Sequence, residues 1–127
     1  MTQKLLLILL LPFGVWAQQF SHADSLRGTL SPARACFDVK HYDLRVSVNP
    51  AEKSISGSNS IRFITTQKTS KIQLDLFANR VIDEIRWAGQ KVKFRRDGNA
   101  VFIQAGKEIP AKQEQTVFVK YHGLPRP

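Results

Sequence analysis

The chain has 127 residues, a net charge of +9 and one cysteine, and these numbers restrict its class. A single cysteine excludes an internal disulfide framework, so the fold must be held by packing or by docking on something larger. A basic balance of this size fits nucleic acid, acidic glycans or membrane lipid as partners, but it also occurs on domains that bind none of them.

The first 17 residues have the layout of a secretory signal peptide. Lys4 precedes an unbroken apolar run at residues 5–11, and small or modest residues lead to a cleavage site after Ala17. The run is too short to span a bilayer, which needs about 20 residues. We therefore expect removal of residues 1–17, a secreted or periplasmic chain and no transmembrane segment. A buried amino-terminal strand or helix is the alternative.

Residues 18–35 show no sustained periodicity, and Gly28 and Pro32 would interrupt one. We expect a flexible or surface-draped lead-in here. The remaining residues, 36–127, have the length of one domain.

Two alternating segments open this domain. Apolar residues in the first alternate with polar ones, which predicts a half-buried strand whose dry face carries Tyr42, Leu44, Val46 and Val48. Asn49-Pro50 ends it, and a second alternation runs over residues 55–63 with serines at 54, 56, 58 and 60 on its wet face. The short connection predicts an antiparallel hairpin. Gly57 indicates a bulge or a close backbone approach.

Five more short strands are predicted, around residues 72–76, 81–87, 91–95, 101–103 and 117–121. Turns separate them at 88–90 and 97–99, and a loop containing Pro110 covers 106–112. In the second of these strands Val81, Ile85 and Trp87 share a side, with Ile82 opposite. No segment sustains helical spacing. About seven short strands predict an all-β fold, an antiparallel β-sandwich or an open barrel.

No cluster of reactive side chains stands out. The three histidines, His22, His41 and His122, lack the spacing of a zinc site, and no H-E-x-x-H is present. The carboxylates, Asp38, Asp43, Asp75, Asp83 and Glu84, show no pairing suited to acid–base work. Cys36 is expected to be a buried structural thiol. We therefore predict no catalytic, cofactor-binding or metal-ligating residue in this chain.

The sharpest surface feature is the sequence KVKFRR at 91–96. Lys91, Lys93 and Arg95 would share one face, while Val92 and Phe94 point into the core. Cations in a row can bind a phosphate backbone, but sheet-based readers also expose aromatic rings for stacking. A charged edge strand that discourages sheet association explains the pattern better. We predict no nucleic-acid partner.

Five short patterns occur in an order that resembles the start of the aminopeptidase N family of zinc metallopeptidases, notably its exported bacterial members. They are His41-Tyr42, Asn49-Pro50, Ile-x-Gly at 55–57, Leu-Asp-Leu at 74–76 and Tyr-x-Gly-x-Pro at 121–125. The resemblance covers residues 36–127. Each pattern is ordinary strand-and-turn chemistry, and only their order makes the resemblance specific.

The resemblance implies a scaffold. It implies a saddle-shaped antiparallel β-sandwich packed against a catalytic domain, which carries the zinc and the peptide-hydrolysing residues and lies outside this chain. Some members add a glutamine near the substrate's amino end, but Gln113 and Gln115 lack the surrounding pattern and receive no role. The match ends about midway through the family's N-terminal domain, so we expect an incomplete sandwich that is marginal or self-associating on its own.

Three functions remain open from the sequence. The first is the inactive N-terminal piece of a secreted zinc metallo-aminopeptidase, whose partner is the missing catalytic domain. The alternative is a stand-alone secreted basic β-sandwich that binds an acidic glycan or protein. The third, a small enzyme in its own right, would need a clustered reactive site.

Overall fold

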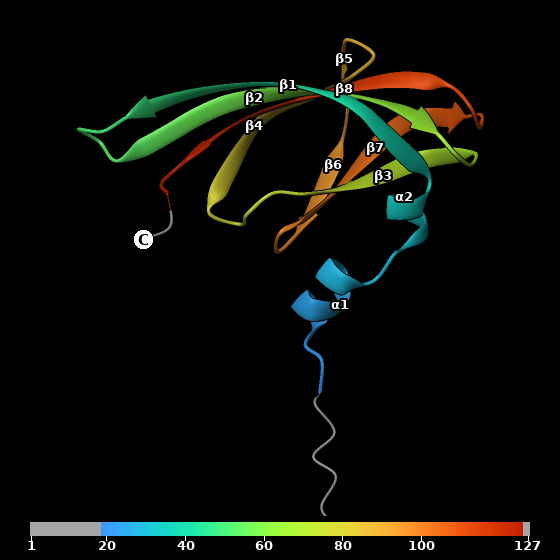
Figure 1. Cartoon of the computed structure of the whole chain (residues 1–127), viewed down its shortest axis with the longest axis horizontal. Coiled ribbons are helices and arrows are strands. Elements are labelled where there is room, and N and C mark those ends of the chain that lie inside the picture. The colour runs from blue at the N-terminus through green and yellow to red at the C-terminus, as the bar shows by residue number, and fades with distance from the viewer. Residues whose placement is uncertain (1–18, 126–127) are drawn as a thin grey trace, which may run out of the picture.

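The computed structural model describes residues 19–125, and eight strands within them form two antiparallel sheets (Figure 1). The first sheet has the strand order β1-β2-β8-β4-β5 and the second has β3-β7-β6. The strands are β1 (Phe37–Asn49), β2 (Ser54–Thr65), β3 (Thr69–Asp75), β4 (Arg80–Trp87), β5 (Gln90–Lys91), β6 (Phe94–Asp97), β7 (Ala100–Ile109) and β8 (Glu114–Gly123). The predicted antiparallel β-sandwich is confirmed, although β1 and β2 are long, at 13 and 12 residues.

The lead-in contains two short helices that the sequence did not predict, α1 (His22–Gly28) and α2 (Pro32–Ala35). Ser21 caps α1 in a capping box with Asp24, and Pro32 occupies the first turn of α2. Both are too short to show helical periodicity. No helix within residues 19–125 has the length and apolarity to cross a membrane. The predicted signal peptide lies outside the described residues.

The lead-in is attached to β3 by polar contacts. The Gln73 side chain donates to the Leu26 carbonyl at 3.3 Å and accepts from the Ser31 hydroxyl at 3.0 Å. Arg34 forms an ion pair with Asp75. Because Gln73 is buried, its two hydrogen bonds offset the cost of removing its amide from water.

The core lies between the two sheets and centres on Phe63 of β2. Its ring meets those of Phe37 and Trp87 edge-on, with centroids 5.2 and 5.7 Å apart. The other fully enclosed apolar side chains include Ile72 and Ile103 of the small sheet and Val117 of β8. Cys36 is a free thiol, and its predicted burial is confirmed.

The predicted tight turns are confirmed. The first hairpin pairs Asn49 with Ser54, and the turn at 88–90 joins β4 to β5. Gly98, at φ 57°, lies between Asp97 and Ala100, which pair across the β6–β7 hairpin. Left-handed backbone of this kind costs glycine little, which is why the sequence reveals such turns.

One predicted face of β4 is wrong because of a register shift. Val81 was expected to share a side with Ile85 and Trp87, but it is exposed, while Ile82 packs against the core. The pairing with β8 shifts between Ile82 and Glu84, which leaves Asp83 as an extra residue. A bulge reverses the alternation beyond it, so Ile82 faces the same way as Ile85.

The predicted strand at 91–95 is divided between the sheets. Residues 90–91 form β5 beside β4, and residues 94–97 form β6 beside β7. Val92 packs against the core as expected, but Phe94 is 39% exposed because β6 is the edge of the small sheet. The predicted loop at 106–112 begins too early, since β7 continues to a buried Ile109.

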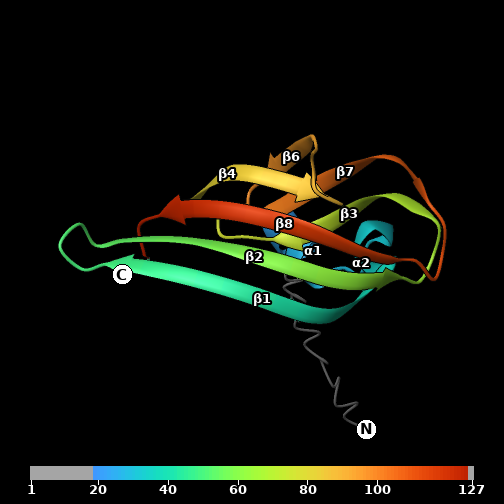
Figure 2. The same cartoon turned by 90° about the horizontal axis from the view of Figure 1, so that it is seen from above.

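The two sheets differ in extent, and Figure 2 shows the β1–β2 hairpin reaching well beyond β3, β6 and β7. The small sheet therefore covers only part of the large one. We call the covered part the closed half and the projecting part of β1, β2 and β8 the open half.

Candidate functional site

The apolar face of the large sheet continues from the closed half into the open half. Across β1 and β2, Tyr42 lies opposite the buried Ile61, and Val48 lies opposite Ile55. Directly opposed residues of an antiparallel pair share a face. We define the open face as Tyr42, Leu44, Val46, Val48 and Ile55.

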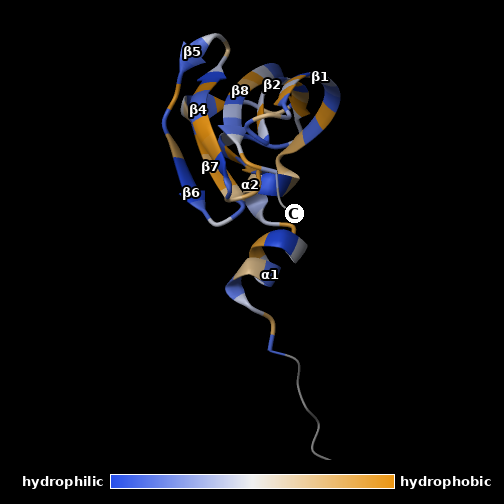
Figure 3. Cartoon of the chain, turned by 90° about the vertical axis from the view of Figure 1, so that its left-hand side faces the viewer, coloured by the Kyte–Doolittle hydropathy of each residue, from blue (hydrophilic) through white to orange (hydrophobic). Residues whose placement is uncertain are grey.

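The open face corrects a prediction. The four β1 residues were expected to be dry, yet their side chains are 51–62% exposed. Their alternation is as predicted, and orange and blue stripes follow one another along β1 in Figure 3. What differs is that no second layer lies over them among the described residues. A contiguous exposed apolar face of this kind is typical of a surface that contacts another protein segment.

A bulge gives β1 a second inward-facing set of residues. The pairing with β2 shifts between Val39 and His41, so Lys40 is extra. Phe37 and Val39 before the bulge and Tyr42 after it therefore turn to the same side of the sheet. Phe37 and Val39 pack against the core, and the residues after Tyr42 do not.

A groove of about 520 Å³ marks the boundary between the two halves. Tyr42, Asn59, Leu74, Val119 and Tyr121 are among its lining residues, so both sheets contribute. Within it, the Asn59 Oδ1 atom is buried and has no hydrogen-bond partner among residues 19–125. A buried acceptor left unpaired costs free energy, so a donor reaching this groove would find a ready acceptor.

Gly57 shapes the same face, and the predicted close approach is confirmed. A Cβ atom added to Gly57 would lie 2.7 Å from the Arg45 carbonyl oxygen and 2.8 Å from the Tyr121 hydroxyl. No real Cβ tolerates such contacts without movement of its neighbours. The missing side chain of Gly57 thus lets the Tyr121 ring approach the β2 backbone closely at the groove.

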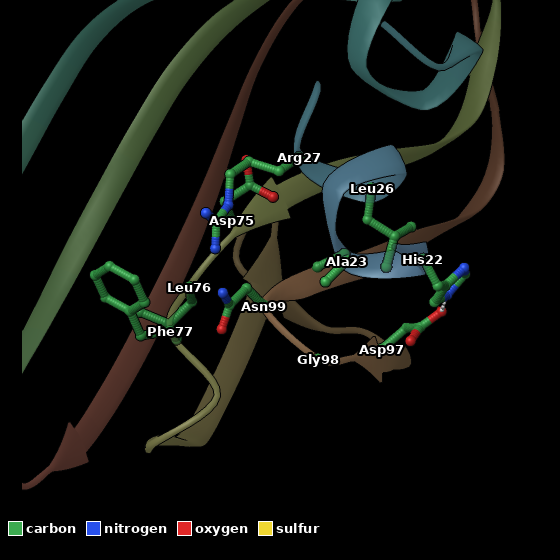
Figure 4. Close-up of a pocket in the computed structure, with 11 residues that line it drawn as sticks. His22, Ala23, Leu26, Arg27, Asp75, Leu76, Phe77, Asp97, Gly98 and Asn99 are labelled. Carbon is green, nitrogen blue, oxygen red and sulfur yellow. Dashed lines mark hydrogen bonds and ion pairs between the residues drawn. The ribbon is translucent and has the colours of Figure 1, made fainter. Parts of the chain in front are cut away.

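A second cavity, of about 390 Å³, lies between α1 and the turn that begins at Asp97 (Figure 4). His22 Nε2 is 2.9 Å from Asp97 Oδ2 across its mouth. Asp75 in the same lining is paired with Arg34. These polar groups satisfy one another at an exposed surface, where such pairs contribute little.

The histidines are carried by three different elements. His22 belongs to α1 and lies 2.9 Å from Asp97, His122 of β8 lies 2.7 Å from Asp83, and His41 is exposed on β1. Within residues 19–125, no group of three or more His, Cys, Asp or Glu residues is placed to hold a metal ion.

The perturbed titratable groups are structural in character. Hydrogen bonds from Ser21 lower the pKa of Asp24, and the hydrogen bond from Arg86 is the main cause that lowers the pKa of Glu84. Burial lowers the pKa of the Arg96 guanidinium. A general acid or base needs a pKa moved toward neutrality, and the two carboxyl groups are moved away from it.

Arg96 is a structural residue that the sequence did not single out. Its guanidinium donates to the carbonyls of Leu76, Phe77 and Arg80, and it thereby joins β6 to the segment between β3 and β4. Its neighbour Arg95 stacks on Phe102, with 4.6 Å from Cζ to the ring centroid. The basic run at 91–96 therefore extends over two different sheets, and its two arginines make different contacts.

Gln113 and Gln115 have structural partners. The Gln113 backbone N–H donates to the Thr65 hydroxyl at 2.9 Å, and its carbonyl accepts from the Thr65 N–H at 2.9 Å. The Gln115 side chain accepts from Trp87 Nε1 at 2.8 Å. Both contacts hold β8 against its neighbours in the closed half.

Comparison with known proteins gives a likeness in structure. No protein-family model matches the sequence, and no curated protein matches it significantly. An M1 zinc metallopeptidase from Deinococcus radiodurans, a point mutant bound to a Tyr-Ser-Ala substrate, superposes with a TM-score of 0.66 at 24% identity. That match covers 74% of this chain and 22% of the peptidase.

Two further structures agree. A two-domain M1 zinc metallopeptidase bound to L-arginine has a TM-score of 0.64 at 26% identity, covering 73% of this chain and 21% of the other. Native yeast LTA4 hydrolase has a TM-score of 0.61 at 21% identity, covering 72% and 15%. The chain thus spans about a fifth of the M1 metallopeptidases it matches, and its fold is that of their N-terminal β region, as the resemblance predicts.

Proposed function

We propose that this chain is the non-catalytic N-terminal scaffold domain of a secreted zinc metallo-aminopeptidase. Peptide hydrolysis from the amino end would be carried out by a catalytic domain outside these residues. The likeness to M1 zinc metallopeptidases over about a fifth of their length supports this assignment.

The open face is the observation that carries the scaffold role. It presents core-type side chains, Leu44, Val46 and Val48, to solvent on a sheet that is otherwise well packed. Burying one such side chain fully stabilises a protein by about 1.5–3 kcal/mol relative to leaving it exposed. A neighbouring part of the enzyme that covers this face would gain that free energy.

We propose that the zinc ligands lie in the catalytic domain. His22 and His122 each pair with a separate aspartate, and within residues 19–125 no three His, Cys, Asp or Glu side chains are placed to hold a metal ion. This chain is then inactive alone. Secretion is supported by the charged start and apolar run of residues 1–17.

The alternative is a stand-alone basic module for an acidic glycan or protein. It is favoured by the net charge of +9 and by two cations, Lys71 and Arg95, placed over the Phe102 ring at 5.6 and 4.6 Å. Binding of the full chain to an acidic polysaccharide, lost at high salt, would support it.

Reading the coding frame beyond Pro127 tests the main proposal. We expect an open frame that encodes H-E-x-x-H and a later glutamate, as a zinc peptidase requires. A stop codon with no such region downstream would contradict the assignment.

An activity assay tests the non-catalytic role separately. The pure chain with added zinc should release nothing from amino-acid anilide substrates, and the protein encoded by the whole frame should release the dye. Peptidase activity in the pure chain would overturn the scaffold role and leave the fold unaffected.

A further inference from the structure

Strand β1 is a free edge of the large sheet. Among residues 19–125 it lies first in the strand order and pairs with β2 alone, and it forms one margin of the sheet in Figure 2. Every second residue of such an edge directs an unpaired backbone N–H and C=O to solvent, which is a template for another strand.

The usual protection of an edge strand is confined to the two ends of β1. The bulge at Lys40 and its lysine side chain discourage pairing at one end, and the Asn49-Pro50 turn ends the strand at the other. Residues 41–48 between them contain no bulge, no proline and no lysine. A regular stretch of this length is sufficient for an added strand.

The charges on this stretch are self-complementary. Asp43 and Arg45 flank Leu44 on the outer face, and their side chains are 56% and 81% exposed. They are only loosely paired with each other, at 3.9 Å. In an antiparallel pair of two copies centred on Leu44, Asp43 of each copy would lie directly opposite Arg45 of the other.

The neighbouring symmetric registers are unfavourable. Centring on Asp43 would oppose two aspartates, and centring on Arg45 would oppose two arginines. Like charges directly opposite one another destabilise a strand pair. The register centred on Leu44 also opposes Tyr42 and Val46 on the inner face, an aromatic–β-branched pair of the stabilising kind.

We propose that two copies of this chain associate through their β1 edges, antiparallel and centred on Leu44. A two-fold axis then generates both Asp43–Arg45 pairs at once. The contact uses the backbone edge of β1, so the open face still points away from the sheet and remains accessible to a covering domain. The inference therefore stands independently of the proposed function.

Charge exchange tests the interface. The full chain should show a concentration-dependent dimer in sedimentation velocity. In a dimer of the Asp43→Arg variant, arginine lies opposite arginine at both places where position 43 meets position 45. In a dimer of the Arg45→Asp variant, aspartate lies opposite aspartate at both. Each variant alone should therefore dimerise at least about tenfold more weakly. An equimolar mixture of the two variants restores both opposite-charge pairs, and dimers should return.

Matched substitutions control for net charge. Glu52→Arg in the β1–β2 turn and Lys107→Asp on β7 make the same charge changes at exposed positions outside residues 41–48 and should leave dimerisation unchanged. Far-ultraviolet circular dichroism reports whether each variant folds. A wild-type chain that stays monomeric, variants that dimerise like wild type, or a mixture that fails to recover would each overturn the proposal. Association through residues 1–18 would persist in both the Asp43→Arg and the Arg45→Asp variant, so the experiment distinguishes it from association through β1.

Discussion

The closed and open halves of the molecule have the same strand chemistry but different surroundings. In the closed half, Ile61, Phe63 and Val117 of the large sheet are buried against Ile72 and Ile103 of the small one. In the open half, the same sheet presents Leu44, Val46 and Val48 to solvent. Alternation along a strand therefore reports which face is apolar, and a second layer decides whether that face is dry.

The largest expected difference between the halves comes from one change made in both. Val117→Ala removes two methyl groups from a fully buried site and should lower the free energy of unfolding by about 2–3 kcal/mol. Val46→Ala makes the same change at a half-exposed site and should cost under about 1 kcal/mol, mostly through strand propensity. Urea unfolding of both variants measures the difference, and equal losses would erase the distinction.

Arg96 joins β6 to the segment between β3 and β4 in the closed half, so we expect its replacement to cause the second-largest loss in the free energy of unfolding. Arg96→Met keeps the aliphatic stem but removes the guanidinium hydrogen bonds to the carbonyls of Leu76, Phe77 and Arg80. We expect a loss of about 1–3 kcal/mol by the same unfolding measurement. Arg96→Lys should recover only part of it, because an ammonium group lacks the planar fork. Full recovery by lysine would show that charge alone matters there.

Gly57 tests whether the open half is tightly packed where Tyr121 crosses it. Gly57→Ala would place a Cβ within 2.8 Å of both the Arg45 carbonyl and the Tyr121 hydroxyl. The clash includes backbone, so we expect a loss of about 1–3 kcal/mol. Gly28→Ala meets no atom within 4 Å and serves as the neutral control in thermal unfolding. If Gly57→Ala left the stability unchanged, the backbone and side chains of the open half would be able to move aside at little cost.

The smallest effect is expected from Glu84 on the solvent side of β4. Its folded pKa is lowered, chiefly by the Arg86 hydrogen bond and then by the charges of Arg86, Lys91 and Lys120. Its contribution to stability is therefore present above the ordinary glutamate pKa and is lost as the pH falls through the lowered value. Glu84→Gln should flatten the acid limb of a stability–pH profile slightly. An unchanged limb would assign that acid dependence to other carboxylates.

Much of the fold could be predicted because it depends on local signals. Asn49-Pro50 and the glycine turn at Gly98 fixed two hairpins, and the alternation at 55–63 fixed the buried face of β2. The errors arose where one inserted residue reverses that alternation. Asp83 moved Ile82 inward and Val81 outward, and no residue type at that position announces a bulge.

The candidate site was less predictable, because it depends on where the second sheet ends. Nothing in the residues of β1 reveals that Val39 packs against the core while Val46 stays exposed. Asn59 gave one available signal, since it is a polar residue at an inward position of an apolar alternation. Arg96 gave none, because its role depends on carbonyls about 20 residues away in sequence.

Carbene footprinting of the open face tests the central claim most directly. The measurement compares labelling of Leu44, Val46 and Val48 in the isolated chain with that in the protein encoded by the whole reading frame. The account predicts strong labelling in the isolated chain and protection in the longer protein, with Ile72 and Ile103 protected in both. Equal labelling of the β1 residues in the two proteins would contradict it.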